Sequence, residues 1–183
     1  MSKHNRTQTA VMRLLLPTML AALALAVPTA VARSGSFVIQ SDHKIGSYAV
    51  RKDGSLRGLI AAYGDPSRVG RQREICHVRW RSVGLAVTFY NLGGANPCEP
   101  AAGRFSQATM TGTRWRTSVG LRVGDRVSRL RALYRQAKSR SAWWWLVTRR
   151  TPFGDGGSYP GLAAKVQGGR VTALRVAYPA GGD

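Results

Sequence analysis

The sequence predicts an α+β fold of two helix-then-antiparallel-strand units that share one layer of sheet and contain one disulfide. Two short amphipathic segments lie 71 residues apart, and alternating or β-branched runs follow each of them. Only two cysteines are present. We divide the chain into an export signal (1–32), an N-terminal arm (33–44), a first unit (45–111) and a second unit (112–183). The arm and both units are expected to form one compact domain.

Residues 1–32 have the pattern of an export signal. Basic residues precede an apolar run from Leu14 to Val31, which ends in Ala30-Val31-Ala32, the small-x-small form of a cleavage site. We expect cleavage after Ala32, and an uncleaved membrane anchor is the alternative. The protein is therefore predicted to be secreted or to reside in a bacterial cell envelope.

The first unit is predicted to begin with a strand over Ile45–Val50 and to continue into a helix. Leu56, Leu59 and Tyr63 recur at helical spacing, so they form one apolar face. Gly64 follows as the left-handed residue that ends the helix. These three apolar side chains are expected to pack on the sheet.

Three strands are predicted after this helix, over Arg73–Trp80, Leu85–Leu92 and Phe105–Thr111. In the first of them Cys76 and Val78 alternate with polar residues, which is typical of a strand with one buried face.

Cys76 and Cys98 are predicted to form a disulfide. An exported chain meets an oxidising compartment, where an even number of cysteines favours a bridge over a metal or redox site. Closing this loop is expected to stabilise the fold by about 3 kcal/mol.

The second unit begins with a predicted helix over Arg126–Tyr134. Val127, Leu130 and Tyr134 form its apolar stripe, and Asp125 is placed to cap its first turn. A polar connector is expected to follow this helix, from Gln136 to Ser141.

Three further strands are predicted in the second unit, over Ala142–Thr148, Leu162–Gln167 and Arg170–Tyr178. A long loop is expected over Thr151–Gly161. The last two strands are expected to form a hairpin, because Gly168-Gly169 is a favoured two-residue turn.

The two tandem units, over Ile45 to Tyr178, resemble known families, and the residues that carry the resemblance lie in the second unit. Gly120–Asp125 leads into the stripe of Val127, Leu130 and Tyr134, and the strands Trp143–Val147, Leu162–Gln167 and Arg170–Tyr178 follow. This pattern resembles the β-lactamase-inhibitor-protein fold and the BamE-like (SmpA/OmlA) lipoproteins. The resemblance implies a non-catalytic, protein-binding module. Two features depart from these families: each half has one helix where family units usually have two, and the lipid-anchoring cysteine is absent. No contact residue is transferred.

The predicted mature chain is strongly basic. Without the signal it has 25 Lys and Arg residues against 8 acids, a formal charge of +17. High G+C codon usage explains many arginines but not the scarcity of acids. Attraction to anionic envelope polymers or lipid head groups is the functional alternative. Specific binding to nucleic acid is not expected, because the sequence contains no helix-turn-helix, zinc-finger or RNP motif.

Three stretches are predicted to supply a binding surface for a protein or an anionic envelope polymer. The first is Trp143-Trp144-Trp145, whose outer two rings share one face of a strand; they are either core on both sides or an exposed aromatic platform. The second is the long loop, and the third is the basic border of the second helix. The candidate residues are Trp143, Trp145, Arg149, Arg150, Phe153, Asp155, Tyr159, Arg131 and Arg135.

The sequence contains no catalytic or metal-binding motif, and no cofactor is expected. His43 and His77 are interpreted as ordinary polar side chains, because no histidine, cysteine or acid cluster accompanies them. The protein is therefore predicted not to be an enzyme. A small envelope hydrolase is the alternative, and it requires one of these histidines beside an acid and a serine.

Overall fold

The structure is a computed structural model that describes residues 37–50, 54–151 and 156–178. The export signal, Asp53, Phe153 and Asp155 lie outside the described residues. No helix among the described residues is long and apolar enough to cross a membrane.

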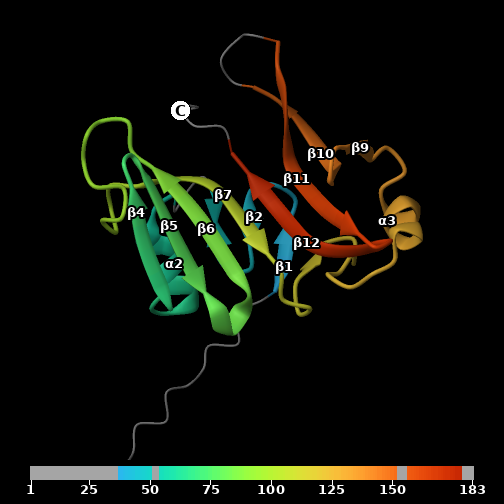
Figure 1. The fold of residues 1–183 in the computed structure, drawn as a ribbon, viewed down its shortest axis with the longest axis horizontal. Helices are drawn as coiled ribbons and strands as arrows, with labels where there is room; N and C mark the ends of the chain where they lie inside the picture. Colours follow the sequence, from blue (N-terminus) through green and yellow to red (C-terminus); the bar gives the residue numbers. More distant parts are fainter. Residues whose placement is uncertain (1–36, 51–53, 152–155, 179–183) are drawn as a thin grey trace, which may run out of the picture. The chain divides into compact units, whose positions relative to one another are not determined.

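The protein is built on an eight-stranded antiparallel sheet (Figure 1). The strands run in the spatial order β4-β5-β6-β7-β12-β11-β10-β9. Their bounds are β4 Arg68–Gln72, β5 Ile75–Trp80, β6 Leu85–Tyr90, β7 Arg104–Met110, β9 Lys138–Arg140, β10 Trp143–Arg150, β11 Ser158–Gln167 and β12 Arg170–Ala177. Strands β7 and β12 join the two halves of the sheet, with Met110 opposite Leu174.

A second, four-stranded sheet packs on one face of the large sheet together with helix α2 (Leu56–Tyr63). It has the order β3-β2-β1-β8, and β1 pairs with β8 in parallel. Its strands are β1 Val38–Gln40, β2 Lys44–Ile45, β3 Tyr48–Ala49 and β8 Arg116–Thr117. Ile39 lies in the predicted arm and Ile45 at the start of the first unit, and both are fully buried, so β1 of the predicted arm belongs to the core.

The strand-rich α+β class and the disulfide are confirmed, but the single layer of sheet and the two-unit repeat are wrong. The small sheet takes three strands from the first half of the chain and one from the second. The predicted strand Ile45–Val50 is two short strands around a turn at Gly46, whose φ is 58°. The two helices are also not equivalent: α2 buries Leu56 and Leu59, whereas α3 (Val127–Leu133) buries only Leu130.

The apolar faces predicted for both helices contact the core. Leu56 and Leu59 are buried, and the hydroxyl of half-buried Tyr63 donates to the carbonyl of Ile45 at 2.7 Å. In α3, Val127 and Tyr134 are half-buried on either side of Leu130. The helix therefore lies at the margin of the core.

The predicted cap of α3 is wrong. Arg126 occupies the N-cap position, and no side chain caps the helix. The carboxylate of Asp125 instead accepts a hydrogen bond from the N–H of Arg122 at 2.9 Å and pairs with Arg129 Nε at 3.2 Å. It is therefore engaged by the preceding turn and by the helix surface. At the other helix Gly64 ends the helix with a positive φ of 76°, and its N–H donates to the carbonyl of Ile60, but its ψ of −167° is outside the left-handed helical region that was predicted.

Two edge strands differ from the prediction. Strand β4 was not expected, and β9 lies inside the expected polar connector. All eight residues of these two strands are exposed, so neither strand has the alternation of a strand with a buried face. The predicted hairpin is confirmed at Gly168-Gly169, where φ is 57° and 72°.

The disulfide joins Cys76 of β5 to Cys98, as predicted. Cys76, Val78 and Trp80 all face the core, with exposed fractions of 0%, 0% and 1%. The indole of Trp80 donates to the carbonyl of Gly64 at 2.8 Å, so a large aromatic core residue also satisfies the end of α2.

Candidate functional site: the open face of the large sheet

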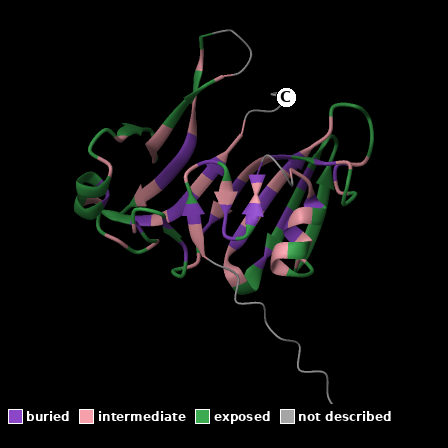
Figure 2. Cartoon of the chain, turned by 180° about the vertical axis from the view of Figure 1, so that it is seen from behind, coloured by how far each residue is buried: buried purple, intermediate pink, exposed green. Residues whose placement is uncertain are grey.

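One face of the eight-stranded sheet is packed and the other is open. Helix α2 and the small sheet lie against the first face (Figure 2). No described element covers the second, which we call the open face. Because side chains alternate along a strand, β5 directs Cys76 and Val78 inward and His77 and Arg79 onto the open face.

A row of directly paired residues crosses every strand of the open face, and four of its eight members are cations: Arg68, Arg79, Arg175 and Lys138. Directly paired residues of neighbouring strands share a face, so the register defines the row. With a strand spacing of about 4.8 Å, the seven intervals span about 34 Å. The row consists of Arg68, Arg79, Ala86, Thr109, Arg175, Ala163, Trp145 and Lys138.

None of the eight strands of this sheet contains an aspartate or a glutamate. The described acids lie in turns and loops: Asp42, Asp65, Glu74, Glu99 and Asp125. The charges of the row therefore have no carboxylate on their own strands to neutralise them, and the open face attracts anions.

Trp143 and Trp145 form an aromatic platform at the β10 end of this face. The guanidinium carbon of Arg175 lies 3.6 Å from the ring centroid of Trp143, and that of Arg140 lies 4.6 Å from the ring centroid of Trp145. Both rings are half-buried. They supply planar surface that a ring-shaped ligand can stack on.

Small residues lie beneath the platform. Ala163 and Ala173 are 1% and 4% exposed, although they are outside the main core cluster. Ala163 pairs directly with Trp145, so the large rings and Arg175 lie over alanine. Trp144 points to the opposite side, where it packs against the core and where Arg131 lies 5.2 Å from its ring centroid.

Arg175 is the most enclosed cation of the row. Burial lowers its pKa, and its Nε is buried with no hydrogen-bond partner among the described residues. Arginine nonetheless keeps its charge in proteins. The positive charge is therefore held against Trp143 in a partly desolvated place, where a cation–π contact is stronger than in water.

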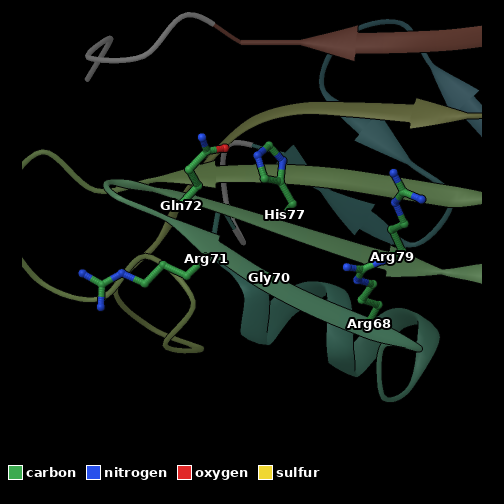
Figure 3. Close-up of a pocket in the computed structure, with 6 residues that line it drawn as sticks. All are labelled: Arg68, Gly70, Arg71, Gln72, His77 and Arg79. Atoms are coloured by element: carbon green, nitrogen blue, oxygen red, sulfur yellow. The ribbon is translucent and has the colours of Figure 1, made fainter.

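The opposite end of the open face is polar and hollowed. Arg68, Gln72, His77 and Arg79 extend from β4 and β5 around a shallow pocket of about 410 Å³ (Figure 3). A second hollow of about 200 Å³ continues across β6 and β7 and shares His77 and Arg79. No phenylalanine, tyrosine or tryptophan lines either hollow, so this end offers charge and hydrogen-bond donors and lacks a large aromatic platform.

Arg149, a predicted binding residue, is held by an internal contact. Its guanidinium donates to both carboxylate oxygens of buried Asp42, at 2.8 Å and 2.9 Å. Burial by itself raises the pKa of Asp42, but the hydrogen bonds from Arg149 and Ser41 lower it to about 2. A Cβ on Gly161 would lie 2.9 Å from the Cβ of Asp42, so glycine is needed for this close approach. The pair ties the N-terminal strands to β10.

The remaining predicted binding residues do not converge on one place. Arg150 and Tyr159 are in the β10–β11 ladder, since β11 begins at Ser158, inside the expected loop. Arg131 lies behind the sheet, and Arg135 is exposed beyond α3. Trp143 and Trp145 belong to the open face described above. Arg68, Arg79, Arg140 and Arg175 were not predicted from the sequence as site residues. The alternation of β5 already placed Arg79 on the face away from Cys76, but no local signal predicts which residue of another strand pairs with Arg79.

Ser41, Asp42 and His43 are adjacent, as the hydrolase alternative would require. The serine hydroxyl donates to Asp42 Oδ1 at 3.0 Å, and His43 Nδ1 lies 3.5 Å from the same oxygen. Serine and histidine therefore both contact the acid, whereas a nucleophilic serine must donate to the histidine. Among the described residues no group of three histidines, cysteines or acids is placed to hold a metal ion.

No protein-family model matches the chain, and no curated protein matches it either. A solved structure, described as an extracellular protein containing an SCP domain from Bacillus anthracis str. Ames, aligns with a TM-score of 0.39 and 12% sequence identity. The alignment covers 68% of this chain and 43% of that one. This degree of similarity does not establish a shared fold.

Proposed function

We propose that the protein is an exported, non-enzymatic binding module that holds an extended anionic polymer of the bacterial cell envelope across its open face. The observation that carries the proposal is the row with its four cations, Arg68, Arg79, Arg175 and Lys138, beside the tryptophan platform on a sheet whose strands contain no acid. A polymer offers anionic groups at repeated intervals, so it can meet several cations of a row about 34 Å long.

Export is supported by two independent features. Residues 1–32 have the composition of a signal segment. Cys76 and Cys98 are joined in a disulfide, which persists in oxidising compartments outside the cytoplasm. In such a compartment the module meets the anionic polymers of the envelope.

The two ends of the open face have different parts in this proposal. Arg68 and Arg79 attract the charged groups of the polymer. Trp143 and Trp145 stack on its ring-shaped or apolar units, and Arg175 holds a positive charge beside them. Several weak contacts on one rigid sheet keep the polymer bound at salt concentrations that screen any single surface charge.

Binding of a protein partner is the alternative. The resemblance to the β-lactamase-inhibitor-protein fold and the BamE-like lipoproteins suggested it, and it remains a prediction. An acidic protein surface is then the expected partner, because the same cations would meet it.

The test is binding of the mature chain to defined polymers. Poly(glycerol phosphate) supplies phosphate, polygalacturonate supplies carboxylate, and dextran is the neutral control. We expect both anionic polymers to bind at about 0.15 M salt, where the Debye length is about 8 Å, and to protect Trp143 and Trp145 from iodide quenching. Trp80 and Trp115 are 1% and 0% exposed, so they contribute little to quenching. Trp144 is half-buried on the opposite side of β10, so its quenching should remain when a polymer binds the open face.

The matched control removes equal charge elsewhere. R79Q/R175Q alters the open face, whereas R57Q/R122Q alters exposed residues of α2 and of the loop after β8. The first variant is expected to lose at least tenfold in affinity (~1.4 kcal/mol), and the second less than about twofold. Failure of both anionic polymers to bind, or equal losses in the two variants, contradicts the proposal.

A further inference from the structure

We infer that the hollow between β4 and β5 is a binding site for a phosphate group, so that the anionic polymer of the proposed function is a phosphodiester polymer. The inference rests on the proposed function and names the chemistry of its ligand. It is carried by Arg68, Arg79, His77 and Gln72, which the hollow brings together (Figure 3).

Two like charges are paired at the hollow. Arg68 and Arg79 are directly opposite in the β4–β5 ladder, so their side chains leave the sheet on the same side, as Figure 3 shows. Like charges in this position destabilise a sheet. No described carboxylate forms an ion pair with either of them. A bound anion would remove the repulsion and receive donors from both guanidinium groups.

Two further side chains, Gln72 and His77, line the hollow. Gln72 and His77 extend on the same side of the two strands as the arginine pair, whereas Arg71 points away and donates to the carbonyl of Arg73 at 3.1 Å. Thr88 Oγ1 lies 3.4 Å from His77 Nδ1, a contact that orients the ring. The site thus has two guanidinium groups along one side and an amide and an imidazole at its end.

The two guanidinium groups suit a tetrahedral anion better than a planar one. A carboxylate is planar with two acceptor oxygens, which one guanidinium fork satisfies. Phosphate is tetrahedral, and its non-bridging oxygens point in different directions, so two forks on neighbouring strands can each bind it. The lining contains no phenylalanine, tyrosine or tryptophan, so the hollow recognises the charged group, and stacking on the polymer takes place at the tryptophan platform.

The strand that carries the site is also anchored in place. The N–H and the hydroxyl of Ser67 both donate to the carbonyl of Arg79 at 2.8 Å. This contact fixes the start of β4 against β5 directly beside the arginine pair. Arg68 and Arg79 are therefore held opposite each other before any ligand binds, which reduces the entropy lost on binding.

The experiment follows the side-chain NMR signals of Arg68 Nε, Arg79 Nε and the His77 ring in the mature chain at about 0.15 M sodium chloride. The probes are poly(glycerol phosphate), polygalacturonate at equal charge concentration, and inorganic phosphate. We expect poly(glycerol phosphate) and inorganic phosphate to shift all three signals. We also expect the phosphate polymer to bind about tenfold more tightly than polygalacturonate, because it engages both guanidinium forks.

Variants separate the site from general charge. R68Q/R79Q is expected to lose the preference for phosphate while keeping the residual affinity for polygalacturonate. R57Q/R122Q removes the same charge and should keep the preference. R79K keeps the positive charge but removes the guanidinium fork, so it should retain only part of the preference for the phosphate polymer. Unchanged tryptophan emission and an intact disulfide establish that each variant folds.

The outcomes distinguish this inference from the function on which it rests. Equal affinity for the two anionic polymers, a preference that survives in R68Q/R79Q, or arginine signals that inorganic phosphate leaves unmoved would each overturn the phosphate site and leave the open face as a general anion binder. If neither polymer binds, the proposed function itself fails.

Discussion

The two ends of the open face use arginine in different ways. At the β10 end the guanidinium carbons of Arg175 and Arg140 lie 3.6 Å and 4.6 Å from the ring centroids of Trp143 and Trp145. At the β4 end Arg68 and Arg79 oppose each other above a polar hollow. A planar cation on an indole ring contributes packing as well as charge, whereas the guanidinium forks at the polar end remain available to a ligand. The same residue type is thus part of the scaffold at one end and part of a candidate site at the other.

The two ends are also held by different bonds. The disulfide of Cys76 fixes β5, next to the polar hollow. The ion pair of Asp42 with Arg149 ties the small sheet to β10, next to the platform. A covalent bridge is indifferent to acid, but an ion pair is not. Reduction should therefore weaken the polar end, and acid should weaken the platform end.

Removal of the disulfide has the largest expected effect. C76A/C98A is expected to lower the free energy of unfolding by about 3 kcal/mol, because the bridge, with a sequence separation of 22, no longer restricts the unfolded chain. Urea denaturation followed by tryptophan fluorescence measures it. The reduced wild-type protein is the control, and both forms should lose phosphate-polymer affinity before they lose the tryptophan platform. A loss below about 1 kcal/mol would show that packing around β5 suffices.

Acid is expected to weaken the platform end. The folded pKa of Asp42 is about 2, below the unfolded value of about 3.9. Its stabilising contribution is therefore complete above about pH 5 and is lost as the pH falls from about 4 towards 2. We expect about 1–2 kcal/mol of stability to depend on this titration. D42N should remove that part of the pH dependence, and D65N, at an exposed turn, should not. Identical pH profiles for D42N and the wild type would contradict the assignment.

Arg175→Met separates packing from charge at the platform. Methionine fills a similar volume and removes the buried Nε that lacks a described partner. We therefore expect the free energy of unfolding to rise by less than about 1 kcal/mol, because a buried unpaired polar atom is removed. Polymer affinity should nonetheless fall several-fold, because a charge of the row is gone. Thermal unfolding and a polymer titration of the same sample measure the two quantities, and a parallel loss of both would make Arg175 structural.

Relief of the like-charge pair has the smallest expected effect. R68Q should raise the free energy of unfolding by about 0.2–0.5 kcal/mol at low salt, because like charges directly opposite in a sheet repel. The gain should disappear at about 1 M salt, where the Debye length is about 3 Å. R57Q is the control, since Arg57 is an exposed residue of α2. A destabilised R68Q would mean that an unseen contact already stabilises this arginine.

Local patterns predicted the parts of the fold that bury one face. Leu56 and Leu59 recur at helical spacing and are buried, and Cys76, Val78 and Trp80 alternate and are buried. Gly168-Gly169 formed the expected hairpin turn. Each of these signals depends on neighbours within a few residues, and the physical cause, burial of one side of a single element, acts at that range.

Edge strands and capping escaped the same reasoning. β4 and β9 are wholly exposed, so their pairing leaves no apolar period in the sequence, and cations on edges are a usual feature of strands that must not aggregate. Aspartate is a favoured N-cap residue. The carboxylate of Asp125 is instead bound by the N–H of Arg122 and by Arg129 Nε. A choice among several partners is made by the tertiary structure.

The sequence by itself determined the charge of this protein, its disulfide, the apolar faces of its helices and the alternation that puts Trp143 and Trp145 on one side of a strand. Apart from the β11–β12 hairpin, only the tertiary structure decided which strands are neighbours. That order places Arg175 over Trp143, and Arg79 opposite Arg68. The physical reason is that strand register joins residues far apart in the chain through backbone hydrogen bonds, whose pattern is the same for every side chain. A candidate site made by register is therefore visible only once the sheet has formed.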